Sequence, residues 1–205
     1  MRRLKLLPIA LVVIAHAASA QQFTKPGAIK LSAPVILDTT GMFQARYAKL
    51  GEDVFIGGQP TEKALRDLKA QGVTTVVNLR SPQEMQTAVK FDEEALVKQL
   101  GMRYVYIPMR GTPELPYSPA GLDKFAEAMK TADGKVLLHC TIAWRASHMW
   151  TAYLIRERGI SEGDALANGR AINLMDDHRQ GPNGRQPVEE FLNRNLPGIG
   201  HPPGH

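Results

Sequence analysis

Cysteine is nearly absent from this sequence: Cys140 is the single one among 205 residues. The chain therefore cannot form an internal disulfide. His178, His201 and His205 show no metal-ligand spacing, and we expect neither a metal site nor a cofactor. A free cysteine is commonly a small buried side chain, but an accessible thiol in an oxidising compartment needs a functional reason.

Long apolar runs are also lacking. The stretch over residues 6–15 is too short to span a bilayer, and no later segment looks long and apolar enough. A basic start at residues 2–5 precedes that stretch, and the small residues 18–20 follow it, which is typical of a secretory signal peptide. We therefore expect residues 1–20 to be cleaved, and the mature protein to be periplasmic or secreted without a stable membrane anchor.

Net charge is small once that leader is set aside. The full chain has 25 basic and 20 acidic residues, a net charge of +5. Three of the basic residues and none of the acidic ones lie in the leader, so 22 and 20 remain, a net charge of +2. The basic residues are scattered rather than clustered, and we expect no nucleic-acid partner.

Strand and helix patterns alternate along the rest of the chain. Apolar runs predict strands at 54–57, 73–79, 104–107 and 136–138, with weaker signals at 35–37 and within 43–50. Helices are predicted after the caps Thr61 and Ser118 and over 83–100, 145–158, 162–173 and 187–195. This alternation favours an α/β fold of three layers, a mostly parallel sheet flanked by helices.

The same patterns divide the chain into parts. We expect a signal peptide at 1–20, an N-terminal arm at 21–50, one domain at 51–196 and a mobile tail at 197–205. In α/β sheets, ligands bind beyond the carboxyl ends of the strands. Cys140, residues 78–80 and the loop 108–119 all follow predicted strands, so we expect the site among them.

Cys140 lies where the apolar run ends and a helix begins, at about Arg145. The turn between them points backbone N–H groups at one spot, which favours anion binding. The same dipoles and Arg145 would stabilise a thiolate, and the planar Arg145 fork can grip two phosphate oxygens. Ser147 can donate to the sulfur as it leaves phosphorus. The pattern predicts a nucleophile in an anion cradle, with a phosphorylated substrate or another anion as its partner.

His139-Cys140 followed by an Arg and a Ser resembles the signature loop of cysteine-dependent tyrosine and dual-specificity phosphatases. The upstream segments that resemble the bacterial beta-lactamase-hydrolase-like or DUF442 group are Ile56-Gly57-Gly58-Gln59-Pro60 and 72–80 with Glu84. The similarity covers roughly residues 52–160. It implies a dual-specificity-phosphatase fold and hydrolysis of phosphomonoesters, phosphotyrosine-like, through a phosphocysteine and without a metal.

The resemblance also implies roles for individual residues. Cys140 would be the nucleophile and Arg145 the phosphate clamp. The residues expected to line the substrate site are Thr141, Ile142, Ala143, Trp144, Ala146 and Arg80. Arg80 either binds substrate or pairs with Glu84, four residues on. His139 either holds the loop or is a buried core histidine.

The loop departs from the usual phosphatase pattern in three ways. Four residues separate Cys140 from Arg145 instead of five, a length that the bacterial group also shows, and Ala146 falls on the usual arginine position. Ala143 replaces a frequent glycine and disfavours a positive φ. Trp144 either walls the pocket or blocks it.

The missing general acid is a further departure from the usual phosphatase pattern. Phosphatases of this type usually carry an Asp on the loop that here spans 108–114, which contains none. Glu114 is the nearest carboxylate, and Asp176 and Asp177 are the other candidates. Without an acid, only esters with good leaving groups, such as aryl phosphates, would turn over well.

Two alternative functions remain. A rhodanese-type sulfurtransferase also begins its loop with Cys, and residues 78–84 resemble a rhodanese-like strand and turn. The other alternative is an inactive pseudophosphatase that binds phospho-ligands, which Ala143, Trp144 and the missing Asp suggest.

Overall fold

The computed structural model describes residues 31–175 and 184–196. The expected signal peptide at 1–20, the first part of the arm and the tail at 197–205, which holds His201 and His205, lie outside the described residues. Asp176, Asp177 and His178 also lie outside them.

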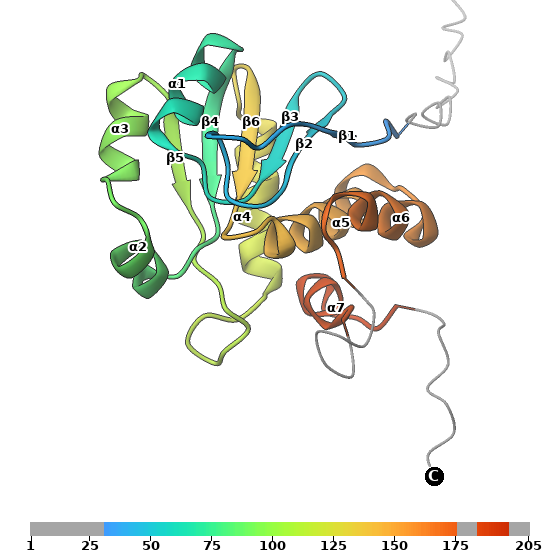
Figure 1. Cartoon of the computed structure of the whole chain (residues 1–205). Coiled ribbons are helices and arrows are strands. Elements are labelled where there is room, and N and C mark those ends of the chain that lie inside the picture. The colour runs from blue at the N-terminus through green and yellow to red at the C-terminus, as the bar shows by residue number, and fades with distance from the viewer. Residues whose placement is uncertain (1–30, 176–183, 197–205) are drawn as a thin grey trace, which may run out of the picture.

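The described strands form one sheet in the order β1-β2-β3-β6-β4-β5 (Figure 1). They are β1 (Val35–Ile36), β2 (Tyr47–Leu50), β3 (Val54–Gly57), β4 (Val73–Asn78), β5 (Arg103–Tyr106) and β6 (Lys135–His139). The pairs β3–β6, β6–β4 and β4–β5 are parallel, whereas β1–β2 and β2–β3 are antiparallel. The first two strands come from the segment expected to be an N-terminal arm, so residues 35–50 extend the sheet.

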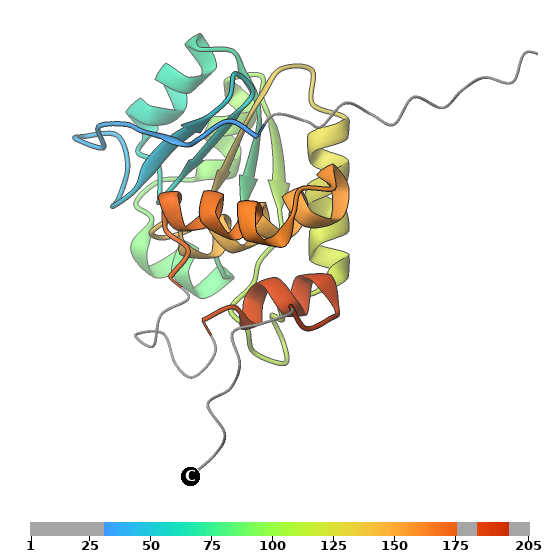
Figure 2. The same cartoon turned by 90° about the vertical axis from the view of Figure 1, so that its right-hand side faces the viewer.

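Helices cover both faces of this sheet. They are α1 (Glu62–Ala70), α2 (Pro82–Ala88), α3 (Glu93–Gln99), α4 (Pro119–Lys130), α5 (Trp144–Arg158), α6 (Glu162–Ile172) and α7 (Gln186–Leu192). Helices α1 and α3 pack on one face, and α4, α5 and α7 lie on the other. Figure 2 shows α6, in orange, crossing in front of the sheet. The predicted three-layer α/β fold with a mostly parallel sheet is confirmed.

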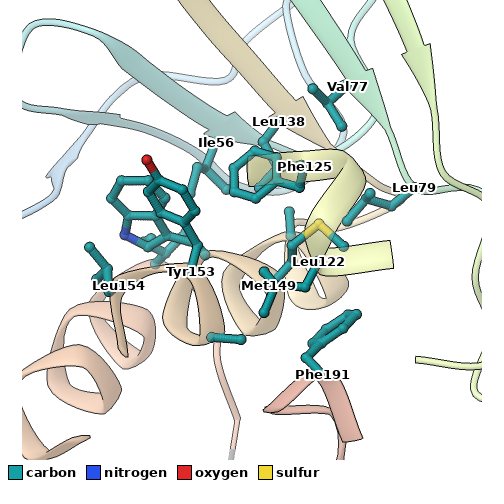
Figure 3. Packing of buried hydrophobic residues seen from close by; sticks show 14 of the residues in the cluster. Ile56, Val77, Leu79, Leu122, Phe125, Leu138, Met149, Tyr153, Leu154 and Phe191 are labelled. Atoms are coloured by element: carbon teal, nitrogen blue, oxygen red, sulfur yellow. The ribbon is translucent and has the colours of Figure 1, made fainter. Parts of the chain in front are cut away.

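Alternation along the strands builds two separate cores. In β6, Val136 and Leu138 point to the α4/α5 face, and Leu137 points to the α1/α3 face. Figure 3 shows the larger core, where side chains of the sheet, α4, α5 and α7 point toward one another. These buried faces explain why the central strands are mostly apolar.

The segment 83–100, expected to be mostly helical, is two helices. Ser81 caps α2, and the chain is already extended at Val89 (φ −96°, ψ 128°). Asp92 then caps α3 by accepting a hydrogen bond from the Ala95 N–H at 2.9 Å. The interruption matters for the site because each of the two helices contributes a glutamate to it.

Within the described residues, every helix is too short or too polar to serve as a membrane-spanning segment.

The strand register brings three strand ends together. Gly57, His139 and Asn78 are register partners at the carboxyl ends of β3, β6 and β4. The candidate site lies just beyond them.

Candidate functional site

Cys140 follows the last residue of β6 and is almost completely buried, with 1% of its surface exposed. Its N–H donates to the Gly57 carbonyl at 3.3 Å. The loop is also paired with the residues after β3, since the Gln59 N–H donates to the Thr141 carbonyl at 3.0 Å. A Cβ on Gly58 would lie 1.6 Å from the Gln44 carbonyl oxygen and 2.8 Å from the Thr141 carbonyl oxygen, so only glycine fits between these two carbonyl groups.

Ala143 adopts the left-handed conformation that its side chain disfavours, with φ 66° and ψ 0°. The expectation that alanine would resist a positive φ is therefore wrong for this loop. The turn must reverse between β6 and α5 within four residues, and this requirement outweighs the local cost, about 1 kcal/mol. An antiparallel bridge between Gly58 and Ile142 ties residues 141–143 to the segment after β3, whereas in the described part of the chain the N–H groups of Trp144 and Arg145, at the start of α5, meet no hydrogen-bond acceptor. They are available to an anion.

Arg145 is buried at the start of α5, and five contacts engage both of its Nη groups. Nη1 donates to the carbonyl oxygens of Leu79 at 3.1 Å and Met109 at 2.7 Å, and to Glu84 Oε2 at 2.9 Å. Nη2 donates to Glu84 Oε1 at 2.6 Å and to Thr141 Oγ1 at 3.0 Å. The guanidinium is therefore fixed in one plane, and Nε–H is the donor that these contacts do not use.

Glu84 is the carboxylate that holds Arg145. It lies in the first turn of α2, where its side chain also accepts the Ser81 N–H at 2.8 Å and the Thr141 hydroxyl at 2.8 Å. Burial raises the pKa of Glu84, but hydrogen bonds from Arg145, the Ser81 N–H and Thr141 outweigh burial and lower the pKa to about 2. From the sequence, Glu84 was predicted as a partner of Arg80 and as part of the family resemblance, but not as the partner of Arg145.

Arg80 is fully buried behind the loop instead of lining an open pocket. Its Nη1 donates to Gln59 Oε1 at 2.7 Å, and its Nη2 donates to the backbone carbonyl of Glu84 at 3.3 Å. The expected pairing with Glu84 thus runs through the main chain, because the Glu84 carboxylate is taken by Arg145. Through these two contacts, Arg80 is placed to support the loop from behind.

A second glutamate, Glu93, organises a buried polar cluster beneath Cys140. Glu93 Oε1 lies 3.0 Å from His139 Nε2 and 3.0 Å from Asn78 Nδ2, and Oε2 accepts from Gln59 Nε2 at 2.5 Å. Burial raises the pKa of Glu93, but attraction to His139 and these hydrogen bonds outweigh it and lower the pKa. His139 is fully buried and its Nε2 contacts Glu93, so the choice between its two predicted roles, holding the loop or being a core histidine, stays a prediction. No pattern in the sequence pointed to Glu93.

The remaining loop residues take varied positions. Ala146 packs in the hydrophobic core, whereas Ile142 is exposed. The Ser147 hydroxyl donates to the Trp144 carbonyl at 2.8 Å instead of to the Cys140 sulfur, because that carbonyl lies one turn back on the helix. The Trp144 ring packs edge-on against Tyr117 at a centroid distance of 6.3 Å, and whether it walls or blocks the pocket stays a prediction.

The loop expected to carry a general acid is a tight turn. The N–H groups of Arg110 and Gly111 both donate to the Leu115 carbonyl, at 2.7 and 2.9 Å. Glu114 lies in this turn, exposed to solvent. Arg110 comes nearer to the site, with Nη1 3.5 Å from Glu84 Oε1. Across the described ranges, no three His, Cys, Asp or Glu side chains gather as a metal site requires.

Comparisons with known proteins fit this geometry. A family model described as DSP-PTPase phosphatase fused to NAD+ kinase matches residues 35–183. A beta-lactamase hydrolase-like protein of Xylella fastidiosa (strain 9a5c) is 26% identical over 127 residues, which are 62% of this chain and 29% of that protein. The match thus spans less than a third of that relative's length.

Solved structures share the fold. The DUF442 protein from Shewanella putrefaciens CN-32 superposes with a TM-score of 0.55 at 22% identity, covering 79% of this chain and 99% of that one. PTPMT1 superposes with a TM-score of 0.56 at 22% identity, covering 72% of this chain and 94% of that one. The fold is therefore that of cysteine-type phosphatases, as the resemblance implied. With its family model covering most of the sequence, the chain belongs to the DSP-PTPase family of tyrosine and dual-specificity phosphatase-like hydrolases.

Proposed function

We propose that this protein is an exported phosphatase that hydrolyses phosphomonoesters through a phosphocysteine on Cys140. The observation that carries the proposal is the loop, with Cys140 at its start, Arg145 at its end and N–H groups at the start of α5 that meet no acceptor among the described residues. N–H and guanidinium groups are the donors that phosphoryl oxygens need. The structural relative PTPMT1 has been solved in complex with PI(5)P, which also supports a phosphorylated ligand.

The reaction has two displacements. The Cys140 thiolate attacks phosphorus, so that the S–P bond forms as the P–O bond to the leaving group breaks and the leaving oxygen takes up a proton. Water then attacks phosphorus, the S–P bond breaks, and the thiolate and inorganic phosphate are released. The first step needs no proton donor when the leaving group is a phenolate of low basicity, so aryl phosphates are the best substrates.

Arg145 assists by presenting donors in a fixed plane. Glu84 keeps the guanidinium in place, and a phosphoryl oxygen can replace the Thr141 hydroxyl on Nη2 while a second oxygen meets Nε. Glu114, exposed in the turn that follows Arg110, is one proposed acid. Asp176 and Asp177 are the other proposed acids.

The test is hydrolysis of para-nitrophenyl phosphate by the mature protein and by Cys140→Ser. Turnover that the variant loses, together with a phosphoryl adduct on Cys140 after acid quench, supports the proposal. A wild-type protein that binds phosphate or vanadate without turnover overturns it. That result would favour a binding-only role, which the engagement of Arg145 by Glu84 makes the second candidate.

Two further measurements complete the test. Cyanide-dependent release of thiocyanate from thiosulfate would instead indicate sulfurtransferase activity. Export is tested by sequencing the N-terminus of the protein recovered from the periplasm or medium. A start at Gln21 supports export, and intact protein confined to the cytoplasm contradicts it.

A further inference from the structure

Arg110 is a cation beside the loop 140–145, and the proposed reaction does not use this side chain. It follows Met109, whose carbonyl accepts from Arg145 Nη1 at 2.7 Å. Its own Nη1 lies 3.5 Å from Glu84 Oε1, the oxygen that accepts from Arg145 Nη2 at 2.6 Å. The two guanidinium groups therefore flank one carboxylate oxygen. The Arg145 side chain is 9% exposed and that of Arg110 is 49% exposed, so Arg110 is the outer member.

The backbone that carries Arg110 is well fixed. Its N–H and that of Gly111 converge on the Leu115 carbonyl, and Thr112 and Leu115 form a further bridge. A Cβ on Gly111, which has φ 74°, would lie 2.6 Å from the Tyr117 ring, so the turn packs closely on that ring. Tyr117 in turn packs on Trp144 of the loop. The backbone of Arg110 is thus held in a set position by this turn and by Tyr117.

Its charge is only weakly neutralised. An ion pair of 3.5 Å with a half-exposed arginine is of little energetic value, and Glu84 already has Arg145 as its main partner. Both arginines and Cys140 act electrostatically on the same hydroxyl, that of Tyr117, whose pKa burial raises to about 12.

We infer that Arg110 selects phosphomonoesters whose leaving group carries a second anionic group, a carboxylate or a phosphate, next to the scissile phosphoryl group. The inference rests on the proposed function. If the cradle and Arg145 hold the phosphoryl group, Arg110 is the next cation outward, since its Nη1 lies 3.5 Å from the Glu84 oxygen that Arg145 also contacts. The planar fork of Arg110 binds either anion with two parallel hydrogen bonds.

Two isosteric esters test this inference: meta-carboxyphenyl phosphate, which carries the second anion, and meta-carbamoylphenyl phosphate, which does not. We expect Arg110→Ala to lower kcat/KM for the first about tenfold, the size of one charge-assisted hydrogen bond, and to change the second less than about twofold. Arg66→Ala is the matched control, because Arg66 is 52% exposed in a 3.7 Å ion pair with Glu62 on α1. The control should leave both esters unchanged. Equal losses for both esters in Arg110→Ala, or no loss for either, overturn the inference.

Binding separates this inference from the proposed function. The Cys140→Ser variant, with and without Arg110→Ala, is titrated with the same two esters by calorimetry. A preference for the carboxylate ester that disappears with Arg110 supports the inference even if the wild-type protein turns over neither ester. Turnover of both esters without any preference in either assay leaves the phosphatase proposal standing and overturns this one. Meta-phenylene bisphosphate, compared with the carboxylate ester, shows which second anion is preferred.

Discussion

The carboxylate of Glu84 accepts two parallel hydrogen bonds from the guanidinium of Arg145, from Nη1 to Oε2 at 2.9 Å and from Nη2 to Oε1 at 2.6 Å. The two residues are 61 positions apart in the sequence. The same carboxylate closes the capping box of α2 through the Ser81 N–H, so one group links the start of a helix to the anion cradle. A bidentate pair of this kind fixes orientation as well as charge.

Replacing Glu84 should therefore be costly. We expect Glu84→Gln to lower the free energy of unfolding by about 3 kcal/mol at pH 7, because buried Arg145 loses its counter-charge and one acceptor oxygen. Urea unfolding measures this loss. Glu62→Gln is the control, since its exposed 3.7 Å pair with Arg66 should contribute less than about 0.5 kcal/mol. Similar losses in the two variants would contradict the structural role of Glu84.

The same pair predicts an acid dependence of stability. The pKa of Glu84 is lowered from 4.5 to about 2 in the folded state. Its ionised form therefore stabilises the fold fully above pH 4.5, and this contribution is lost as the pH falls toward 2. We expect the difference in unfolding free energy between wild type and Glu84→Gln to shrink over this range. A difference that stays constant from pH 5 to about 2.5 would show that Glu84 is not held in its ionised form.

Ala143 offers a test of backbone strain in the loop. Glycine accepts a φ of 66° without the steric cost of a Cβ, so Ala143→Gly should leave stability equal or raise it by up to about 1 kcal/mol. Ala167→Gly, at an exposed helical position in α6, should lose about 1 kcal/mol. Thermal unfolding of both variants measures the contrast. An equal loss in both would mean that the left-handed conformation carries no strain.

The arrangement of the chain was largely predictable because local patterns determine it. The runs at 54–57, 73–79 and 136–138 became β3, β4 and β6, and Ser118 caps α4 as its position predicts. The sequence predicted one helix over 83–100 instead of α2 and α3, because the segments before and after the break both have a helical pattern. It takes the extended backbone at Val89 and the cap at Asp92 to separate them.

The site was predictable only where neighbours in the sequence form it. Cys140 and Arg145 lie on one loop, so their spacing alone indicated a shared anion site. Glu84 of α2 and Glu93 of α3 contact Arg145 and His139 from distant parts of the sequence, and such contacts leave no periodicity or spacing to detect. Arg80 illustrates the reverse error: its place beside Glu84 in the sequence suggested a side-chain pair, but Arg145 competes for that carboxylate.

A lysine in place of Arg145 should fail although the charge is kept. An ammonium group cannot satisfy Leu79, Met109 and both oxygens of Glu84 while also presenting a donor to phosphate. We expect Arg145→Lys to weaken binding of inorganic phosphate by tenfold or more, measured by calorimetry. Arg156→Lys, which alters a surface pair with Asp123, is the control and should bind phosphate normally. Unchanged affinity in Arg145→Lys would exclude the clamp role.

The cluster around Glu93 predicts an effect on the loop from a residue that has no place in the anion cradle itself. Glu93→Gln puts an amide NH₂ where His139, Asn78 or Gln59 directs a donor, so one buried hydrogen bond becomes a contact between two donors. We expect a loss of about 2–4 kcal/mol in unfolding free energy. Since His139 immediately precedes Cys140, we also expect weaker phosphate binding under conditions where the variant remains folded. Glu94→Gln, the exposed neighbour paired with Lys98, is the control for charge and helix position and should change neither quantity by a measurable amount. If Glu93→Gln lost stability but bound phosphate as tightly as wild type, the cluster would serve the core alone and not the geometry of the loop.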